Sequence, residues 1–196
     1  MAKFFNQNQG LSERAMLENK YRSARIDLLL VAIMTLVNVI FVITGSDTYF
    51  LFSATVPYLL SFVSALYCGM LSPEIYEYLE IDVATAEFLP APVFYVALAI
   101  ALVITALYVL AFFLSNKGRV GWLVFALVFF IIDTVVMFGY YGISPDMIID
   151  YVFHGVVIVF LAIGIKARRT LDNLPPEELV AEPVAAPIVD VPEDVQ

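Results

Sequence analysis

The feature that most constrains this chain is a set of apolar runs, each about as long as a helix that crosses a membrane. A helix needs about 20 apolar residues to cross a hydrocarbon core of roughly 30 Å. Hydrophobic residues make up 62% of the 196 residues, and charged residues only 15%. We therefore predict an all-α, polytopic membrane protein with five apolar helices, at residues 26–44, 48–71, 93–115, 120–141 and 145–167.

Two polar regions flank this predicted membrane domain of residues 26–168. Residues 1–25 form a basic arm whose middle part predicts an amphipathic helix that starts near Ser12 and Glu13. This arm is either a helix on the membrane surface or a solvated lead-in to the first span. Residues 169–196 are acidic and rich in proline, which predicts a disordered tail.

The charges restrict both the partners and the topology. The net charge of −9 argues against a nucleic acid partner and leaves the lipid bilayer as the expected surroundings. Basic residues beside spans stay on the cytoplasmic side. The ten basic residues lie in the arm, in one short loop and after the last run: Lys3, Arg14, Lys20, Arg22, Arg25, Lys117, Arg119, Lys166, Arg168 and Arg169.

Five crossings would divide these ten residues equally between the two sides. Four crossings place all ten in the cytoplasm and leave the acidic loop of residues 72–92 outside. Residues 48–71 are the best candidate for a segment that enters and returns, because Pro57 and several hydroxyl groups interrupt it. Their length also suffices to span, so both arrangements stay open.

The same segment carries a stripe of small residues. Ser53, Pro57, Ser61 and Ala65 recur every four residues and would share one helix face. Small residues let a neighbouring helix approach closely. We therefore expect a packing face here rather than a ligand groove.

The loop of residues 72–92 combines a helix start with many acids. Ser72, Pro73 and Glu74 form a typical N-terminal cap, so we expect a short helix through about Glu80. The acids do not have the spacing of a calcium-binding loop. We expect a solvated acidic surface made by Glu74, Glu77, Glu80, Asp82 and Glu87.

Four polar residues lie inside the apolar runs. Asp133 is eight residues before Tyr141, and His154 is nine after Pro145, so both lie about 12–13 Å from one membrane face. Asp150 is one turn before His154. Asn38 joins them, about 10 Å deep, if four segments cross. We predict an intramembrane polar cluster formed by Asp133, His154, Asp150 and Asn38.

This cluster has two interpretations. As a proton or cation relay, Asp133 would carry the charge and His154 would titrate beside it. As a structural pair, the two side chains would only fix helix packing. We favour the structural interpretation, because one acid and one histidine do not make a transport signature.

Several activities are excluded by the residues that the chain lacks. Cys68 and His154 are the only cysteine and histidine, so no disulfide, bis-histidine haem or histidine-rich diiron site can form within the chain. There is no HExxH zinc motif, nucleophile elbow or phosphate-binding loop. We expect no enzyme activity, no cofactor and no metal.

Three stretches carry a resemblance: residues 45–54, residues 120–133, and Leu174-Pro175-Pro176-Glu177-Glu178. Together they resemble a group of small uncharacterised bacterial multispan membrane proteins. The likeness covers most of residues 20–178. It implies a bacterial cytoplasmic membrane and brings no known activity or binding residues.

We therefore expect a non-enzymatic accessory or assembly protein whose cytoplasmic arm and tail contact a protein partner or a second copy. The alternative is an oligomeric transporter or channel subunit that uses the Asp133–His154 pair, since four or five helices rarely enclose a path alone.

Overall fold

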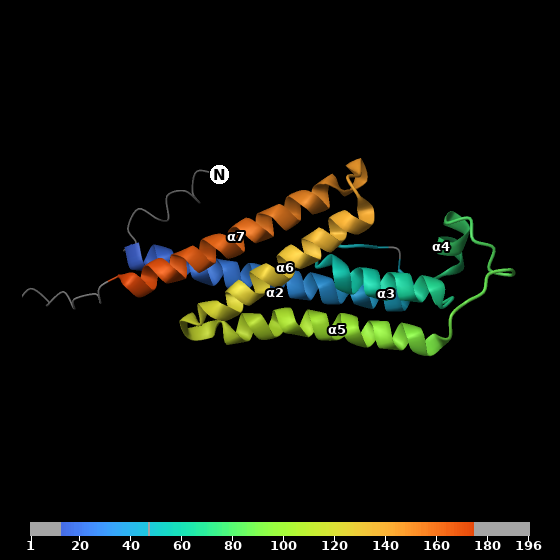
Figure 1. The fold of residues 1–196 in the computed structure, drawn as a ribbon, viewed down its shortest axis with the longest axis horizontal. Coiled ribbons are helices and arrows are strands. Elements are labelled where there is room, and N and C mark those ends of the chain that lie inside the picture. The colour runs from blue at the N-terminus through green and yellow to red at the C-terminus, as the bar shows by residue number, and fades with distance from the viewer. Residues whose placement is uncertain (1–12, 47, 175–196) are drawn as a thin grey trace, which may run out of the picture.

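The computed structural model describes residues 13–46 and 48–174, and within them it confirms an all-helical fold without strands (Figure 1). Two short 3-10 helices, η2 (Asn116–Gly118) and η3 (Pro145–Met147), join the last three long helices. The α-helices are α2 (Glu13–Thr44), α3 (Thr55–Tyr67), α4 (Pro73–Tyr78), α5 (Ala91–Leu114), α6 (Val120–Tyr141) and α7 (Ile148–Asn173).

Four of these helices, α2, α5, α6 and α7, are long and apolar enough to cross a membrane. The protein is therefore of the multi-pass membrane type. The 13 residues of α3 reach only about 20 Å at 1.5 Å per residue, which is less than the hydrocarbon thickness.

Both flanking regions are helical where the structure describes them. The 32-residue helix α2 starts at Glu13 and runs unbroken into the first span, so residues 13–25 are a lead-in and not a separate surface helix. The proposed cap at Ser12 lies outside the described residues. At the other end α7 continues to Asn173, past the expected end at residue 167. Residues 175–196 of the predicted tail are not described.

The expected helix at residues 48–71 is wrong in its first part. Residues 48–54 are not helical, and α3 begins only at Thr55. Phe52 has φ +65°, a left-handed conformation that turns the chain into α3, and its ring packs on Phe153 with centroids 3.7 Å apart. Pro57 lies in the first turn of α3 and not in mid-helix. In the first turn its missing N–H costs no helix hydrogen bond.

The segment from Gly45 to Ser72 starts and finishes at the same end of the bundle. Gly45, just after α2, lies against Ser72, just after α3. Leu89 N–H donates to the Tyr67 carbonyl at 2.8 Å, which joins the end of α3 to the entry of α5. In Figure 1 the chain leaves α2, turns back, and enters α3 halfway along the bundle. Residues 45–67 therefore leave and return to the same end of the bundle, as the four-crossing interpretation requires, and we call them the re-entrant segment.

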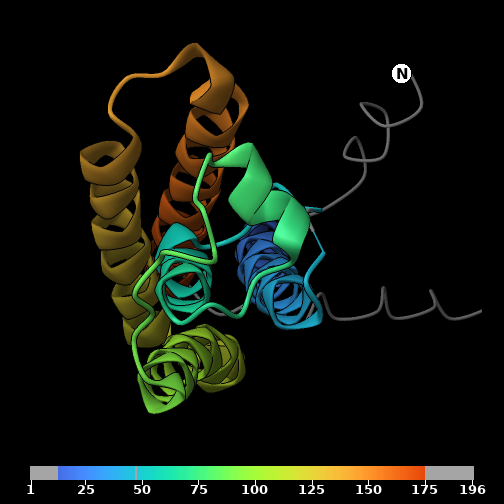
Figure 2. The same cartoon turned by 90° about the vertical axis from the view of Figure 1, so that its right-hand side faces the viewer.

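Viewed end-on, α3 lies among α2, α5 and α6, while α7 packs along α2 (Figure 2). Leu28, Leu123 and Leu161 fill the core between the long helices. A Cβ atom at Gly164 would collide with Ala24, so α2 and α7 are in close contact there. On α3, Pro57, Ser61 and Ala65 are buried as a packing face should be, whereas Ser53 is buried just ahead of the helix.

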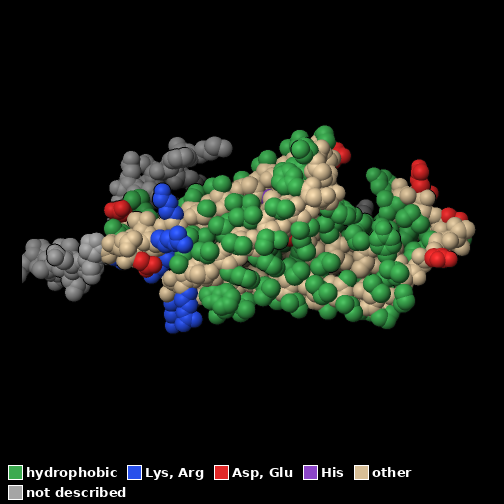
Figure 3. All heavy atoms as spheres, viewed as in Figure 1, with side chains coloured by type: hydrophobic (Ala, Val, Ile, Leu, Met, Phe, Trp, Pro, Cys, Tyr) green, Lys and Arg blue, Asp and Glu red, His purple; other side chains and the backbone are tan. Residues whose placement is uncertain are grey.

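The acidic loop carries α4 at the end of the bundle opposite the basic residues (Figure 3). This helix ends at Tyr78, slightly before the expected Glu80. Ser72 precedes it as predicted, but its side chain makes no capping hydrogen bond. Hydrogen bonds from the Glu74 backbone and the Ser72 side chain lower the pKa of the Glu74 carboxyl. All five acids of the loop are exposed, in agreement with a solvated surface.

Candidate functional site

The re-entrant segment places backbone polar groups that need hydrogen-bond partners in the middle of the bundle. A helix leaves its first N–H groups without partners inside the helix, and non-helical residues have none nearby. A bilayer core supplies no water to satisfy these groups. Residues 48–56 therefore need hydrogen-bond partners from other helices.

Asp133, on α6, supplies the partner for the start of α3. Its Oδ2 accepts a hydrogen bond from the Thr55 N–H at 2.8 Å, and its Oδ1 accepts one from the Val56 N–H at 2.8 Å. Ala54 occupies the cap position and has no side-chain acceptor. Asp133 thus caps α3 from a distance of 78 residues in sequence. Its negative charge also complements the positive end of the helix dipole.

His154, on α7, lies beside this cap. Its Nε2 is 3.4 Å from Asp133 Oδ2 and 3.4 Å from the Thr55 hydroxyl, and its Nδ1 is 3.0 Å from the Asp150 carbonyl. A carbonyl oxygen only accepts, so Nδ1 must carry a proton. The neutral ring then accepts from the Thr55 hydroxyl at Nε2, and a protonated ring donates to Asp133. Phe130 stacks on the ring with centroids 4.8 Å apart.

Two polar residues of α2 hold the part of the segment that precedes α3. Asn38 pairs with both backbone groups of Phe50: its Oδ1 accepts the N–H at 2.8 Å and its Nδ2 donates to the carbonyl at 2.7 Å. One turn earlier, the Thr35 hydroxyl accepts from the Ala54 N–H at 2.7 Å. Asn38 and Thr35 are both completely buried, so these bonds form away from solvent.

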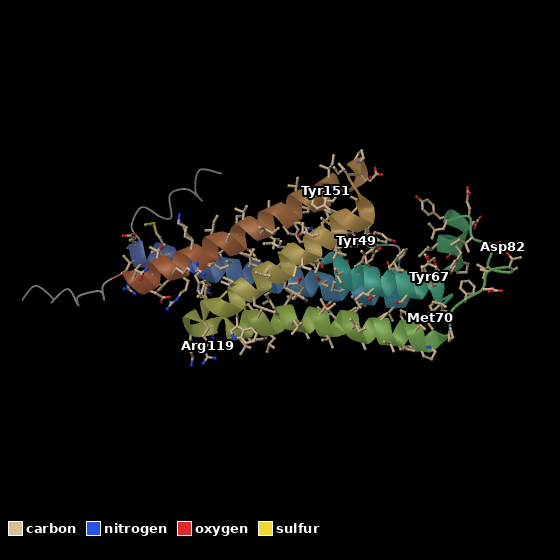
Figure 4. All side chains as sticks on the ribbon, in the orientation of Figure 1. Tyr49, Tyr67, Met70, Asp82, Arg119 and Tyr151 are labelled. Carbon is tan, nitrogen blue, oxygen red and sulfur yellow. The ribbon has the colours of Figure 1, made fainter. Side chains whose placement is uncertain are left out.

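A chain of hydroxyl groups links Asn38 to Asp150. Asn38 Nδ2 donates to the Ser53 hydroxyl at 2.8 Å, which in turn donates to the Tyr49 hydroxyl at 3.1 Å. Tyr49 reaches the side chain of Asp150 on α7. Figure 4 labels Tyr49 ahead of α3 and Tyr151 near the start of α7. The re-entrant segment is therefore anchored on α2, α6 and α7 at once.

The structure places the four predicted residues in one buried region. Asp133 and His154 come together, as the depth arithmetic predicts. Asp150 contributes its carbonyl to His154 and its side chain to Tyr49. Asn38 joins the others through residues 50 and 53. The prediction differed on one point: the main partner of Asp133 is the backbone of α3, with His154 beside it.

Sequence reasoning missed Thr35 and Thr55. Thr35 precedes Asn38 by three residues, so both lie on one face of α2, and two polar residues at that spacing in a span signal a polar contact. Thr55 carried no such signal, because its importance arises from the position at which α3 starts.

Among residues 13–46 and 48–174, no group of three His, Cys, Asp or Glu side chains is placed to hold a metal ion.

No protein-family model, curated protein sequence or solved structure matches this chain. The resemblance to a group of bacterial membrane proteins therefore stays a prediction.

Proposed function

We propose that this protein lies in a bacterial cytoplasmic membrane and acts there as a non-enzymatic accessory or assembly partner. In this proposal the intramembrane cluster is structural and holds the re-entrant segment in place. The observation that supports this structural role of the cluster is the pair of hydrogen bonds from the Thr55 and Val56 N–H groups to Asp133.

The energetics of that pair favour the structural role over transport. A residue that carries an ion or proton must release its other partners during the cycle. If Asp133 did so, two buried N–H groups would be left unsatisfied, at about 1–3 kcal/mol each. A carboxylate that caps a helix is therefore poorly suited to carry an ion or proton and well suited to hold the helix in place.

The proposal orients the protein with its basic end in the cytoplasm, following the distribution of Lys and Arg. The arm before α2 and the tail after α7 then lie on the cytoplasmic side, where they would contact a protein partner or a second copy. The acidic loop with α4 would face the other side.

Size measurement followed by liposome flux tests this proposal. We expect the protein, extracted in mild detergent, to run as a defined complex with itself or with one other protein in fixed ratio. Reconstituted alone, it should carry no more proton flux than empty liposomes. A flux above that background, lost in a folded His154→Gln variant, would contradict the proposal.

One observation favours a second candidate, a proton-conducting subunit. His154 has Asp133 and the Thr55 hydroxyl near one ring nitrogen and a carbonyl at the other, so the ring can gain a proton at Nε2 without losing its Nδ1 bond. The matched control is Thr134→Val, since the Thr134 hydroxyl bonds only within its own helix, to the Phe130 carbonyl. Flux that falls in His154→Gln and persists in Thr134→Val would select this candidate.

A further inference from the structure

The basic end of the bundle contains a groove that the proposed function does not use. It lies between α2, the turn η2 and α7, and has a volume of about 480 Å³. Figure 4 shows Arg119 at this turn, far from Asp82 in the acidic loop. Four cationic side chains and only one acidic side chain line the groove: Arg22, Arg25, Lys117, Arg168 and Glu18.

Two of the cations are held in place by the protein. Arg25 donates from Nε to the Ser115 hydroxyl at 3.0 Å and from Nη2 to the Phe112 carbonyl at 3.0 Å. Arg168 lies over the Tyr21 ring, with 6.0 Å between its Cζ and the ring centroid, and its guanidinium covers Gly118. These guanidinium groups form a fixed floor, because their positions are determined before any ligand arrives.

Arg168 also carries a donor that has no acceptor. Its Nη2 pairs with Asp172 at 2.6 Å, but its Nε is buried and has no hydrogen-bond partner among the described residues. The Arg168 side chain as a whole is 26% exposed and lines the groove, so it presents a guanidinium group there whose hydrogen-bonding capacity the protein does not exhaust. The two remaining cations, Arg22 and Lys117, are exposed at the rim.

We propose that this groove binds the phosphate group of an anionic phospholipid. Guanidinium groups recognise phosphate oxygens through paired, charge-assisted hydrogen bonds. Basic pockets between membrane helices on the cytoplasmic side are suited to acidic headgroups. The groove supplies both, with Arg168 and Arg25 at its floor and Arg22 and Lys117 free to close over the headgroup.

A second, apolar groove favours a lipid over free phosphate. It lies between α2 and α5, has a volume of about 340 Å³, and includes Phe113, four residues before Lys117 in the chain. On α2 it includes Leu36, which is eleven residues, or about three turns, after Arg25 and on the same face. An acyl chain can follow this groove while its headgroup occupies the basic one.

Binding to the full-length protein in neutral detergent tests the proposal. Palmitoyl-oleoyl phosphatidylglycerol is titrated while bound lipid is counted by native mass spectrometry, with phosphatidylcholine and inorganic phosphate in parallel. The double variant Arg22→Gln/Lys117→Gln removes only the exposed rim. We expect it to weaken phosphatidylglycerol binding by about ten- to thirty-fold, since each basic residue near an anionic headgroup contributes about 1 kcal/mol.

The matched control is Arg119→Gln/Arg169→Gln, which changes the net charge equally at exposed positions outside the groove. It should weaken binding by less than about three-fold. Equal losses in both double variants would mean general attraction to the basic end and would overturn the proposal. Phosphatidylcholine that binds as tightly as phosphatidylglycerol would overturn it as well. If inorganic phosphate displaced the lipid at equal concentration, the site would be assigned to free phosphate and the proposal of a lipid ligand would be overturned.

Discussion

The two ends of α3 are held in different ways. The N-terminal end lies inside the bundle, where the carboxylate of Asp133, from α6, accepts two backbone N–H groups. The C-terminal end lies at the acidic end of the bundle, where the Tyr76 hydroxyl, only ten residues away, donates to the Leu66 carbonyl at 3.0 Å. The deep end is bonded to a charged side chain that is distant in sequence. The outer end is bonded to a neutral side chain that is close in sequence.

The difference follows from the surroundings of each end. At the outer end, the Leu66 carbonyl also accepts from the Gly69 N–H, so it keeps a partner when the Tyr76 hydroxyl is lost. At the deep end nothing replaces a lost hydrogen bond, because the hydrocarbon core contains no water. The free energy of unfolding should therefore depend much more on Asp133 than on Tyr76.

The largest effect is expected when the Asp133 cap at the N-terminal end of α3 is removed. Asp133→Leu leaves the Thr55 and Val56 N–H groups unsatisfied and should lower the free energy of unfolding by about 3 kcal/mol or more. Asp133→Asn keeps one acceptor oxygen and should lose about half as much. Unfolding in mixed micelles with increasing SDS measures both. An Asp133→Leu protein as stable as Thr134→Val would show that α3 does not depend on this cap.

The second prediction concerns the segment that leads to α3. The Thr35 hydroxyl accepts from Ala54 N–H, whereas the equally buried Thr105 hydroxyl bonds only to the Ala101 carbonyl of its own helix. Thr35→Val should therefore cost about 0.6–2 kcal/mol. Thr105→Val has the same shape change and should cost less than about 0.5 kcal/mol. Equal losses would mean that the re-entrant segment does not depend on α2.

The smallest effect is expected at the outer end. Tyr76→Phe removes the hydroxyl that bonds Leu66, and should lower the free energy of unfolding by about 0.5–1 kcal/mol, because the Leu66 carbonyl keeps its bond from the Gly69 N–H. Tyr78→Phe is the control, since its side chain is 86% exposed. If Tyr76→Phe destabilised the protein as much as Asp133→Leu, the contrast between the two ends would be wrong.

How far the sequence could predict this structure differs from region to region. The bounds of α6 agree fully with its apolar run, because lipid selects helix length and composition directly. The meeting of Asp133 and His154 followed from equal depth on two helices joined by a short connection. The distribution of Lys and Arg favoured an even number of crossings, and four helices of the described residues are long and apolar enough to cross.

The start of α3 could not be predicted in the same way. Residues 48–54 are as apolar as the helix that follows, and no local signal separates them from it. They are held out of a helix by side chains of α2 that lie 12 to 19 residues away, Asn38 and Thr35. Helix propensity is a local property, so long-range hydrogen bonds of this kind override it.

The most direct test asks whether the re-entrant segment leaves the membrane on the side where it entered. Single cysteines replace Thr48, Glu77 or Lys117 in a Cys68→Ser background, and a membrane-impermeant maleimide labels sealed vesicles of known orientation. The account predicts that positions 48 and 77 react from the same side and position 117 from the opposite side. Labelling of positions 48 and 77 from opposite sides would contradict it, because residues 48–71 would then cross the bilayer.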